Sequence, residues 1–323
     1  MVDRGLTPLE PQTAPAVLMV RPARFGHNGE TAGSNFFQRI AEPAGDSAVN
    51  ALHEFDALAL ALGHAGVRVL QFAGQRAAAL PDELFPNNWL SLHADGTAVL
   101  YPLLAPIRRR ERRTDVLTEL HAQHSYRIDR VVDLTHFESR GEFIEGTGSL
   151  VLDRQHRIAY ACLSPRTHVA PLIEFGRALG YEPVPFRAVD RVGRPIYHTN
   201  VLLAIGTRFA AVCTGAIADA AERHSLMARL ENTGHEILDL SFDQLEAFAG
   251  NLLELRGTRG PVIALSAAAL RSLDGEARRT LERHGELVVA DVATIERVGG
   301  GSVRCMLTEV ALTSAHERAA QEY

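Results

Sequence analysis

Hydrophobic residues along the chain gather in short runs, each preceded by a polar turn and one small polar residue. Five segments share this shape: PNNWLSL, TGSLVLD, HTNVLLAI, AGNLLEL and GGSVRCML. The small polar residues are Asn88, Ser149, Asn200, Asn251 and Ser302, at intervals of 61, 51, 51 and 51 residues. Regular periods near this length are typical of proteins built from repeated supersecondary units. The pattern therefore predicts five equivalent units.

Each unit continues in the same order after its first strand. A turn leads to a second apolar run, a helical stretch follows, and a strand-like run closes several units. The helical pattern covers residues 169–179, 216–230 and 268–284. An opening strand at 16–22 and a helix over 48–62 supply the rest of a circularly closed fifth unit. The sequence thus predicts β-β-α-β units around an axis, with five equivalent turns at one end of a central channel, where function concentrates in such folds.

Composition places the chain among ordinary globular proteins. It has 323 residues, of which 46% are hydrophobic and 22% charged, enough for a large core without disulfides. We expect one catalytic domain over residues 1–323, with a flexible segment at 1–15. That segment lacks the apolar stretch of a secretion signal, and no run approaches the length of a membrane span. Three cysteines form no disulfide framework or CxxC pattern, so a reducing cytoplasm is expected.

The charge balance argues against a nucleic-acid or membrane partner. The formal net charge is −6, with a pI near 6.2. One dense basic run, RRRERR at 108–113, is broken by an acidic residue and is expected to form a solvated helix face. The expected partner is a small-molecule amino-acid substrate; a homo-oligomer is compatible with the sequence, which does not fix the oligomeric state.

The repeat singles out one set of reactive side chains. Cys305 follows Ser302 in the fifth equivalent strand, His198 precedes Asn200 by two residues, and Glu145 precedes Ser149 by four. Units around an axis direct these positions towards one mouth. A cysteine, a histidine and a carboxylate that converge form a nucleophile, an acid–base group and an orienting group.

The other cysteines and histidines offer no second reactive centre. Cys162 and Cys213 lie inside apolar runs and are expected to be inert core residues. A zinc site is not expected, because no second histidine or cysteine stands at ligand spacing. Arg304 is a cation that favours a thiolate at Cys305.

These motifs resemble those of the guanidine-modifying (pentein) superfamily, which includes arginine deiminases, dimethylargininases, agmatine deiminases and amidinotransferases. The resemblance covers nearly the whole chain and implies a five-bladed α/β propeller of ββαβ units with pseudo-five-fold symmetry. GGGSVRCM resembles the segment ending in the catalytic cysteine, which falls at Cys305. IEGTGS resembles the Glu-Gly-Gly-Asp motif with its catalytic glutamate at Glu145, and HTN resembles the His-Leu-Asp motif with its histidine at His198. SPRT resembles a segment whose arginine holds the substrate α-carboxylate, at Arg166.

Two departures from the family pattern bear on the substrate. Arginine deiminases carry aspartates that hold the guanidinium, at the positions of Asn88 and Asn200. A buried guanidinium needs nearby negative charge, whereas a neutral ureido group offers a carbonyl acceptor and NH donors that suit an asparagine amide. The resemblance is therefore greatest to the citrulline-utilisation hydrolases, once labelled amidinotransferase-like.

The sequence thus predicts hydrolysis of citrulline to ornithine, carbon dioxide and ammonia through an S-carbamoyl cysteine, without a cofactor. Further substrate contacts are assigned to Asn87, Arg304 and Phe25, the last in a Gly-rich segment at 19–38 that forms either a lid over the mouth or a surface connection. Three alternatives stay open: a guanidine hydrolase such as an arginine deiminase or dimethylargininase, an amidinotransferase, and a binding-only relative of the superfamily.

Overall fold

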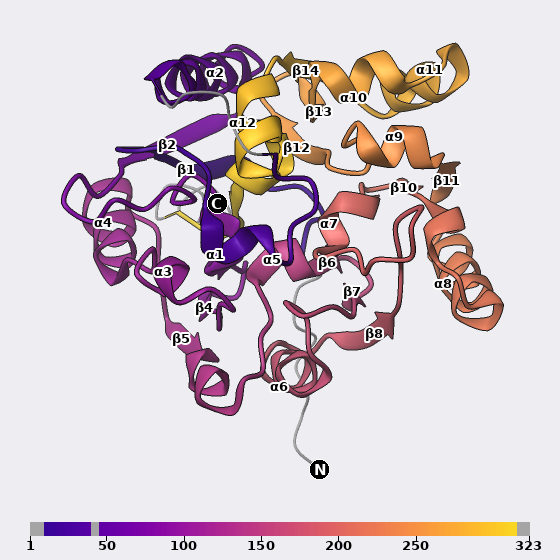
Figure 1. The fold of residues 1–323 in the computed structure, drawn as a ribbon, viewed down its shortest axis with the longest axis horizontal. Coiled ribbons are helices and arrows are strands. Elements are labelled where there is room, and N and C mark those ends of the chain that lie inside the picture. Colours follow the sequence, from indigo (N-terminus) through magenta and orange to yellow (C-terminus); the bar gives the residue numbers. More distant parts are fainter. Residues whose placement is uncertain (1–9, 40–44, 315–323) are drawn as a thin grey trace, which may run out of the picture.

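The computed structural model describes residues 10–39 and 45–314. Within these ranges the strands form five three-stranded units with one shared pattern, visible around the centre of Figure 1. In each unit the first strand runs antiparallel to the second, and the third runs parallel to the second. In chain order, and with the unit that joins the two ends of the chain last, the strands are β3 (Leu90–Leu92), β4 (Thr97–Leu100) and β5 (Arg130–Asp133); β6 (Leu150–Asp153), β7 (Ile158–Cys162) and β8 (Glu182–Phe186); β9 (Leu203–Ile205), β10 (Phe209–Val212) and β11 (Glu236–Asp239); β12 (Leu253–Gly257), β13 (Gly260–Ser266) and β14 (Glu286–Ala290); and β15 (Thr308–Val310), β1 (Ala16–Arg21) and β2 (Arg68–Ala73).

A helical crossover joins the second and third strands of every unit, as a parallel pair requires. These helices lie at the periphery of Figure 1, and short helical segments lie nearer its middle. The crossovers are α2 (Gly45–His64), α4 (Thr114–His124), α6 (Val169–Leu179), α8 (Ala220–Asn232), and α10 (Ala267–Ser272) with α11 (Gly275–His284). The shorter segments are α1 (Gly29–Ala32), α3 (Pro106–Arg109), α5 (Gly146–Ser149), α7 (Thr199–Leu202), α9 (Phe242–Glu246) and α12 (Ala293–Gly299), with single 3₁₀ turns η1 (Pro86–Asn88), η2 (Thr135–Arg140), η3 (Thr214–Ala216) and η4 (Val303–Met306).

The mixed α/β class expected from the sequence is confirmed. The pairing does not close into a single ring among the described residues: one sheet joins β15 to β3 at Val310 and Leu92, and the other three units form separate sheets. The closed five-bladed propeller therefore stays a prediction. The first two strands of each unit are mostly buried, whereas third strands such as β5 and β11 are largely exposed, so the core lies towards the centre.

Two local expectations need correction. The helix predicted over 268–284 is two helices, because the Asp274 side chain accepts hydrogen bonds from the backbone N–H of Glu276 and Ala277 and starts a new one. The flexible segment predicted at 1–15 is ordered in its described part, where Glu10 and Gln12 are buried. Residues 1–9 lie outside the described residues.

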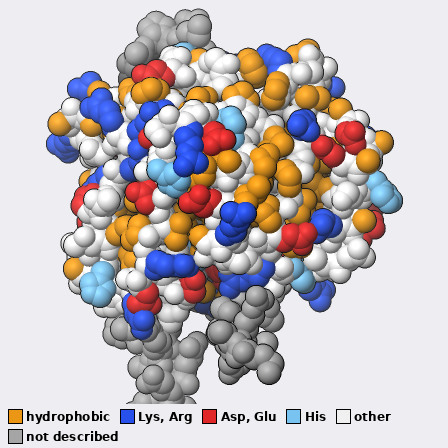
Figure 2. Space-filling view, turned by 90° about the horizontal axis from the view of Figure 1, so that it is seen from below, with side chains coloured by type: hydrophobic (Ala, Val, Ile, Leu, Met, Phe, Trp, Pro, Cys, Tyr) orange, Lys and Arg blue, Asp and Glu red, His pale blue; other side chains and the backbone are white. Residues whose placement is uncertain are grey.

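The surface carries both signs of charge. On the face seen in Figure 2, basic and acidic side chains are intermingled with apolar ones, and neither sign forms a continuous patch. Among the described residues, no helix is both long and apolar enough to cross a membrane.

Candidate active site

The five small polar residues that mark the repeat lie in or beside short helical turns ahead of the first strands. Asn88 ends η1, Ser149 ends α5 and Asn200 lies in α7, while Asn251 and Ser302 precede β12 and η4. All five are buried. Neighbouring turns touch, since Thr199 Oγ1 donates to the Ser149 carbonyl and Asn251 Nδ2 donates to the Asn200 carbonyl at 2.8 Å. The repeat therefore places the turns of successive units side by side.

His198 and Glu145 form a buried hydrogen-bonded pair at these turns. Nε2 of His198 lies 2.8 Å from Oε2 of Glu145, which orients the ring and leaves Nδ1 as its second polar atom. Burial lowers the pKa of His198 to about 4. The hydrogen bond and the negative charge of Glu145 partly oppose this shift. Burial raises the pKa of Glu145, but Arg166, His198 and Arg108 outweigh it and hold that pKa below its ordinary value. The pair is thus a carboxylate beside a neutral imidazole near pH 7.

The sequence pattern predicts Cys305 in a strand, but the structure places it in the 3₁₀ turn η4. Its Sγ receives hydrogen bonds from Nδ2 of Asn251 at 3.3 Å and Nδ2 of Asn200 at 3.6 Å. Burial raises the pKa of the thiol, and the Ser302 backbone, Asn251, Arg304 and Asn200 partly oppose that shift. Two amide donors on one sulfur favour its ionised form, the nucleophile.

Two glycines allow the turns to approach so closely. Gly146 has φ +49°, and a Cβ there would lie 2.0 Å from the Asn87 carbonyl oxygen. A Cβ on Gly148 would lie 2.6 Å from Nδ2 of Asn88 and 2.7 Å from Nδ1 of His198. The glycines of the IEGTGS motif are therefore needed to bring Asn88 and His198 together.

Asn88 binds an arginine that the sequence analysis placed in solvent. Arg108 Nη1 donates to Oδ1 of Asn88 at 2.7 Å, and Nδ2 of Asn88 donates to Oδ1 of Asn87 at 3.0 Å. Arg108 is 2% exposed, so the expectation of a solvated basic run is wrong for this residue. The reason is local: Pro106 starts the one-turn helix α3, which directs Arg108 inward, where Glu111 pairs with it at 2.9 Å.

Arg166 is buried and held from three sides. Its Nε and Nη2 donate to Oγ of Ser34 at 2.9 and 2.8 Å, and Nη2 also donates to the Thr31 carbonyl at 3.0 Å. Nη1 lies 3.4 Å from Oε2 of Glu145. The guanidinium stacks over the Tyr197 ring, 5.1 Å from its centroid. Arg166 thus joins the 19–38 segment to the Glu145–His198 pair.

These side chains line one small pocket with a cavity volume of about 10 Å³. Four residues assigned from the sequence line it directly: Asn88, Arg166, His198 and Cys305. Asn200 contacts the cysteine sulfur, and Glu145 contacts the histidine ring. The remaining lining residues are Thr31, Asn35, Asp82, Phe85, Arg108, Tyr197, Gly299, Gly300 and Gly301.

Besides Asn200, three residues assigned to the substrate do not line this pocket. Asn87 is fully buried beneath Asn88. Phe25 packs near Gly299 and borders an outer surface pocket with Asn28 and Glu30. Arg304 turns to the opposite side of Cys305, because the Leu307 carbonyl and Glu309 bind its guanidinium at 2.7 and 2.9 Å.

The 19–38 segment lines part of the pocket, though not through Phe25. Thr31 and Asn35 line it, and Asn35 Nδ2 donates to the Gly300 carbonyl at 3.1 Å. Arg21, near the start of this segment, pairs with Asp56 at 2.8 Å on the surface. Sequence reasoning also missed Asn251 as a thiol contact, although the repeat had marked its position.

No group of three or more His, Cys, Asp or Glu side chains in ranges 10–39 and 45–314 is arranged to hold a metal ion.

Comparison with solved structures supports the fold. The N-terminal domain of ArgZ, described as an arginine dihydrolase from the ornithine–ammonia cycle in cyanobacteria, matches with a TM-score of 0.70 and 16% identity, over 92% of this chain and 99% of that one. Unliganded AgrE matches with a TM-score of 0.70 and 17% identity, over 91% of this chain and 39% of that one. DDAH from Pseudomonas aeruginosa, in a complex with citrulline, matches with a TM-score of 0.64 and 15% identity, over 92% and 99%.

The chain corresponds to part of a longer solved protein and matches one family model over most of its length. The chain spans 39% of full-length ArgZ, so it corresponds to one part of that protein. A search of curated proteins gave no match. The family model described as N,N dimethylarginine dimethylhydrolase, eukaryotic, matches residues 21–312. The chain therefore belongs to the dimethylarginine dimethylhydrolase family, within the pentein superfamily of guanidine-modifying hydrolases.

Proposed function

We propose that this protein hydrolyses the ureido group of citrulline, with Cys305 as the nucleophile. The observation that carries the proposal is the neutrality of two side chains beside the reactive centre. Asn200 donates to Sγ of Cys305, and Asn88 lines the pocket that Cys305 also lines. A ureido oxygen accepts N–H hydrogen bonds from such amides, whereas a guanidinium has only donors and needs carboxylate acceptors.

The other charges around the pocket support the same substrate class. Glu145 is offset by Arg166 at 3.4 Å and by Arg108 at 3.9 Å. Asp82 and Glu111 lie 3.7 and 2.9 Å from the Arg108 guanidinium. Two arginines thus offset most of the charge of these three carboxylates, and Oδ1 of Asp82, which has no hydrogen-bond partner among the described residues, is the remaining carboxylate acceptor on the pocket wall. Asn88 still has one N–H beyond its bond to Asn87, so it can donate to a ureido oxygen.

The proposed reaction has two steps. His198 takes the proton of the Cys305 thiol, and the resulting thiolate attacks the ureido carbon. His198 then gives this proton to the leaving δ-nitrogen, which releases ornithine and leaves an S-carbamoyl cysteine. His198 then takes a proton from water, the hydroxide attacks the carbamoyl carbon, and the thiolate leaves. The resulting carbamate breaks down to carbon dioxide and ammonia. Glu145 keeps the ring oriented through both steps, since one group serves as acid and then as base.

The α-carboxylate end is assigned to Arg166. This guanidinium is buried, lines the pocket and is already fixed by Ser34 and Thr31. Arg108 lines the same pocket and is a second candidate contact for a carboxylate. On this proposal the five units correspond to the five blades of a propeller, whose turns supply the site.

A guanidine hydrolase is the second candidate. It is favoured by the match to the dimethylarginine dimethylhydrolase family model and by the similarity to ArgZ, described as an arginine dihydrolase. Both candidates use the same thiol chemistry and differ in the substrate group and in which bond breaks.

Product analysis tests the proposal. The purified protein is incubated separately with citrulline, arginine, agmatine and methylated arginines, and ornithine, citrulline and ammonia are each measured. We expect equal amounts of ornithine and ammonia from citrulline, a loss of both in Cys305→Ala, and little change in Cys213→Ala, a matched buried cysteine. Faster formation of citrulline from arginine contradicts the proposal. Transfer of the carbon unit to added glycine identifies an amidinotransferase instead.

The covalent intermediate gives a second test. The sequence contains no lysine, so a carbamoyl group found on acid-quenched protein points to a cysteine or the N-terminal amine. Peptide mapping separates these sites, and we expect the group on Cys305. A protein that binds citrulline but carries no reactive Cys305 is a binding-only relative.

A further inference from the structure

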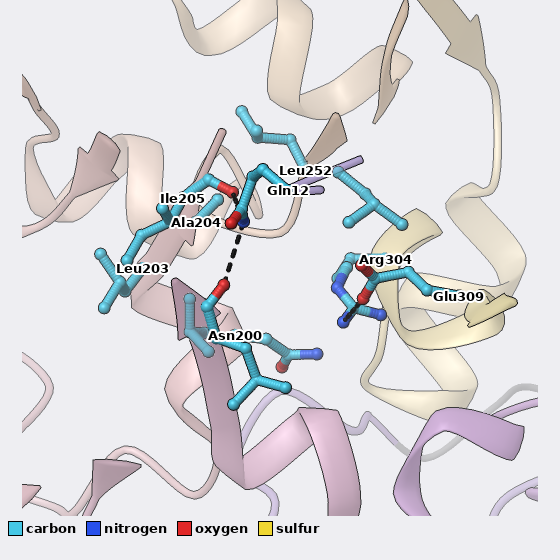
Figure 3. A pocket seen from close by; sticks show the side chains of 11 residues that line it. Gln12, Asn200, Leu203, Ala204, Ile205, Leu252, Arg304 and Glu309 are labelled. Carbon is cyan, nitrogen blue, oxygen red and sulfur yellow. Dashed lines mark hydrogen bonds and ion pairs between the residues drawn. The ribbon is translucent and has the colours of Figure 1, made fainter. Parts of the chain in front are cut away.

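A second, small polar cavity (the axial cavity) lies close to Cys305 and is distinct from the substrate pocket (Figure 3). Asn200, which donates to the Cys305 sulfur, lines this cavity, and so does Arg304, the chain neighbour of Cys305. Gln12 and Glu309 complete the polar lining. In Figure 3 the Arg304 side chain points towards Glu309, and Gln12 reaches in from the N-terminal segment. The cavity therefore brings a buried cation and its carboxylate close to the proposed nucleophile.

Arg304 is the end of a buried row of alternating charges. Glu309 accepts from Arg304 Nη2 at 2.9 Å and from Arg154 Nε at 3.3 Å. Arg154 Nη1 in turn donates to Oε1 of Glu10 at 2.6 Å. The four side chains are between 1% and 7% exposed, so water does not screen them. Arg157 also lies 3.4 Å from Glu10, so the row holds three arginines and two carboxylates, with Glu309 placed between Arg304 and Arg154.

The N-terminal segment closes this row from the far side. Gln12 Nε2 donates to the carbonyls of Leu152 and Ile205 at 3.0 and 3.1 Å, and its Oε1 accepts from Arg154 N at 2.8 Å. Tyr181 donates to Glu10 at 2.9 Å. The row is thus built into the core, and its members have few alternative positions.

We infer that Glu309 is a positioning residue for the nucleophile: it holds the Arg304 guanidinium in the axial cavity and balances its charge, and so sets how readily the Cys305 thiol ionises. Glu309 touches no substrate; it acts through Arg304, the chain neighbour of Cys305. The inference rests on the proposed role of Cys305.

A substitution at Glu309 leaves the other titratable groups around the thiol in place. The pocket-lining groups on the substrate side are Asp82, Arg108, Arg166, Tyr197 and His198, with Glu145 behind His198. The groups around Glu309 are Arg304 and Arg154 and, further along the row, His93, Glu10, Arg157 and Tyr181. A change at Glu309 therefore alters the charge near the sulfur without altering the groups on the substrate side.

The pH dependence of Cys305 alkylation tests the inference without any substrate. Iodoacetamide reacts with the thiolate, and peptide mass spectrometry follows Cys305 separately from Cys162 and Cys213. In Glu309→Gln the Arg304 charge is no longer balanced, so the midpoint of the rate against pH should fall by about one unit. In Arg304→Gln the cation is lost, and the midpoint should rise. The double variant should return towards the wild-type value.

Glu254→Gln is the matched control, because Glu254 is buried and bonded to the Thr207 backbone but is not part of the charge row. A purely structural role for Glu309 lowers thermal stability in both glutamate variants and leaves both midpoints unchanged, which overturns the inference. If Glu309→Gln does not fold, Arg304→Gln decides alone: a raised midpoint supports the inference and an unchanged one overturns it. A wild-type Cys305 no more reactive than Cys162 contradicts the proposed function instead.

Discussion

Asn251 donates from Nδ2 to Sγ of Cys305 at 3.3 Å, while its Oδ1 accepts from the backbone N–H of Arg304 at 3.1 Å. The same Nδ2 donates to the Asn200 carbonyl at 2.8 Å. The amide is therefore fixed at both ends, and one N–H is held towards the sulfur. Asn251 is a neutral donor that stabilises negative charge on Cys305 without contributing charge itself.

Replacing Asn251 should slow the reaction. In Asn251→Ala the thiolate loses its shorter amide donor, and a hydrogen bond to a charged group is worth enough to lower kcat by about 10- to 100-fold. Asn251→Asp should be more harmful, because a carboxylate beside the sulfur opposes its ionisation. Steady-state rates with citrulline check both variants. Equal activity in Asn251→Asp and the wild type contradicts this role.

The repeat shows what the sequence could establish about the site. Equal spacing of Ser149, Asn200, Asn251 and Ser302 was enough to predict which turns would meet, because each unit repeats the same backbone path. It could not separate the roles within the set. Ser149 Oγ accepts from Glu145 N and donates to the Arg166 carbonyl, a support for two site residues, whereas Asn251 faces the thiol. Those roles depend on side-chain direction, which spacing does not encode.

Gly148 leaves no room for a side chain between Asn88 and His198. In Gly148→Ala the new methyl group should push the two apart and lower kcat by at least about 100-fold, since small displacements of reacting groups have effects of this size. Circular dichroism and thermal melting check that the fold survives. Gly63→Ala is the control, because a Cβ there meets nothing within 4 Å and alanine favours the α2 helix. Full activity in Gly148→Ala contradicts the proposed geometry.

Ser34 should affect substrate binding more than chemistry. Its Oγ accepts two hydrogen bonds from Arg166, which is assigned to the α-carboxylate, and it touches none of the reacting groups. We expect Ser34→Ala to raise KM by about 3- to 10-fold with kcat nearly unchanged. Ser139→Ala, on the surface turn η2, is the control. A fall in kcat with unchanged KM shows that Arg166 acts on the Glu145–His198 pair instead.

Arginine positions were the least predictable part of the site. Arg108 and Arg304 looked alike in sequence terms, as exposed or substrate-facing cations, yet each is buried against its own carboxylate, Glu111 or Glu309. Burial of a cation depends on a partner that the fold brings to it. The motifs around Glu145, by contrast, needed only local spacing, and Glu145 lies beside His198 as the repeat predicted.

His93 should make folding stability sensitive to acid. Burial lowers its pKa to about 4, from an ordinary value of 6.5, with Glu10 partly opposing the shift. Between these values the unfolded chain binds a proton that the folded protein cannot, so stability falls as the pH drops through this window. The contribution lost is about 3 kcal/mol by pH 4. Glutamine does not titrate in this range, so the His93→Gln variant should not lose this part of its folding stability.

Urea unfolding at about pH 7 and about pH 4.5 measures the effect. The difference in unfolding free energy between the wild type and His93→Gln should shift in favour of the variant at the lower pH. Parallel behaviour of the two proteins at both pH values contradicts a neutral, buried His93.

Restoring carboxylates at the two amide positions should reverse the substrate preference. In the double variant Asn88→Asp with Asn200→Asp, the negative charges repel a ureido oxygen and attract a guanidinium. We expect kcat/KM for citrulline to fall by about 100-fold or more and arginine to become a tighter competitive inhibitor. Asn200→Asp alone separates the position beside the sulfur from Asn88, whose oxygen already binds Arg108. Unchanged citrulline turnover in the double variant disproves the charge argument.

The most direct test is a competition between citrulline and arginine in one reaction with the wild-type protein. The two substrates carry different isotope labels, and ornithine and citrulline formed from each are measured by mass spectrometry. A neutral-amide site predicts that ornithine comes from citrulline, with kcat/KM for citrulline exceeding that for arginine by at least about 100-fold. Preferential consumption of arginine, with labelled citrulline or ornithine as its product, contradicts the account.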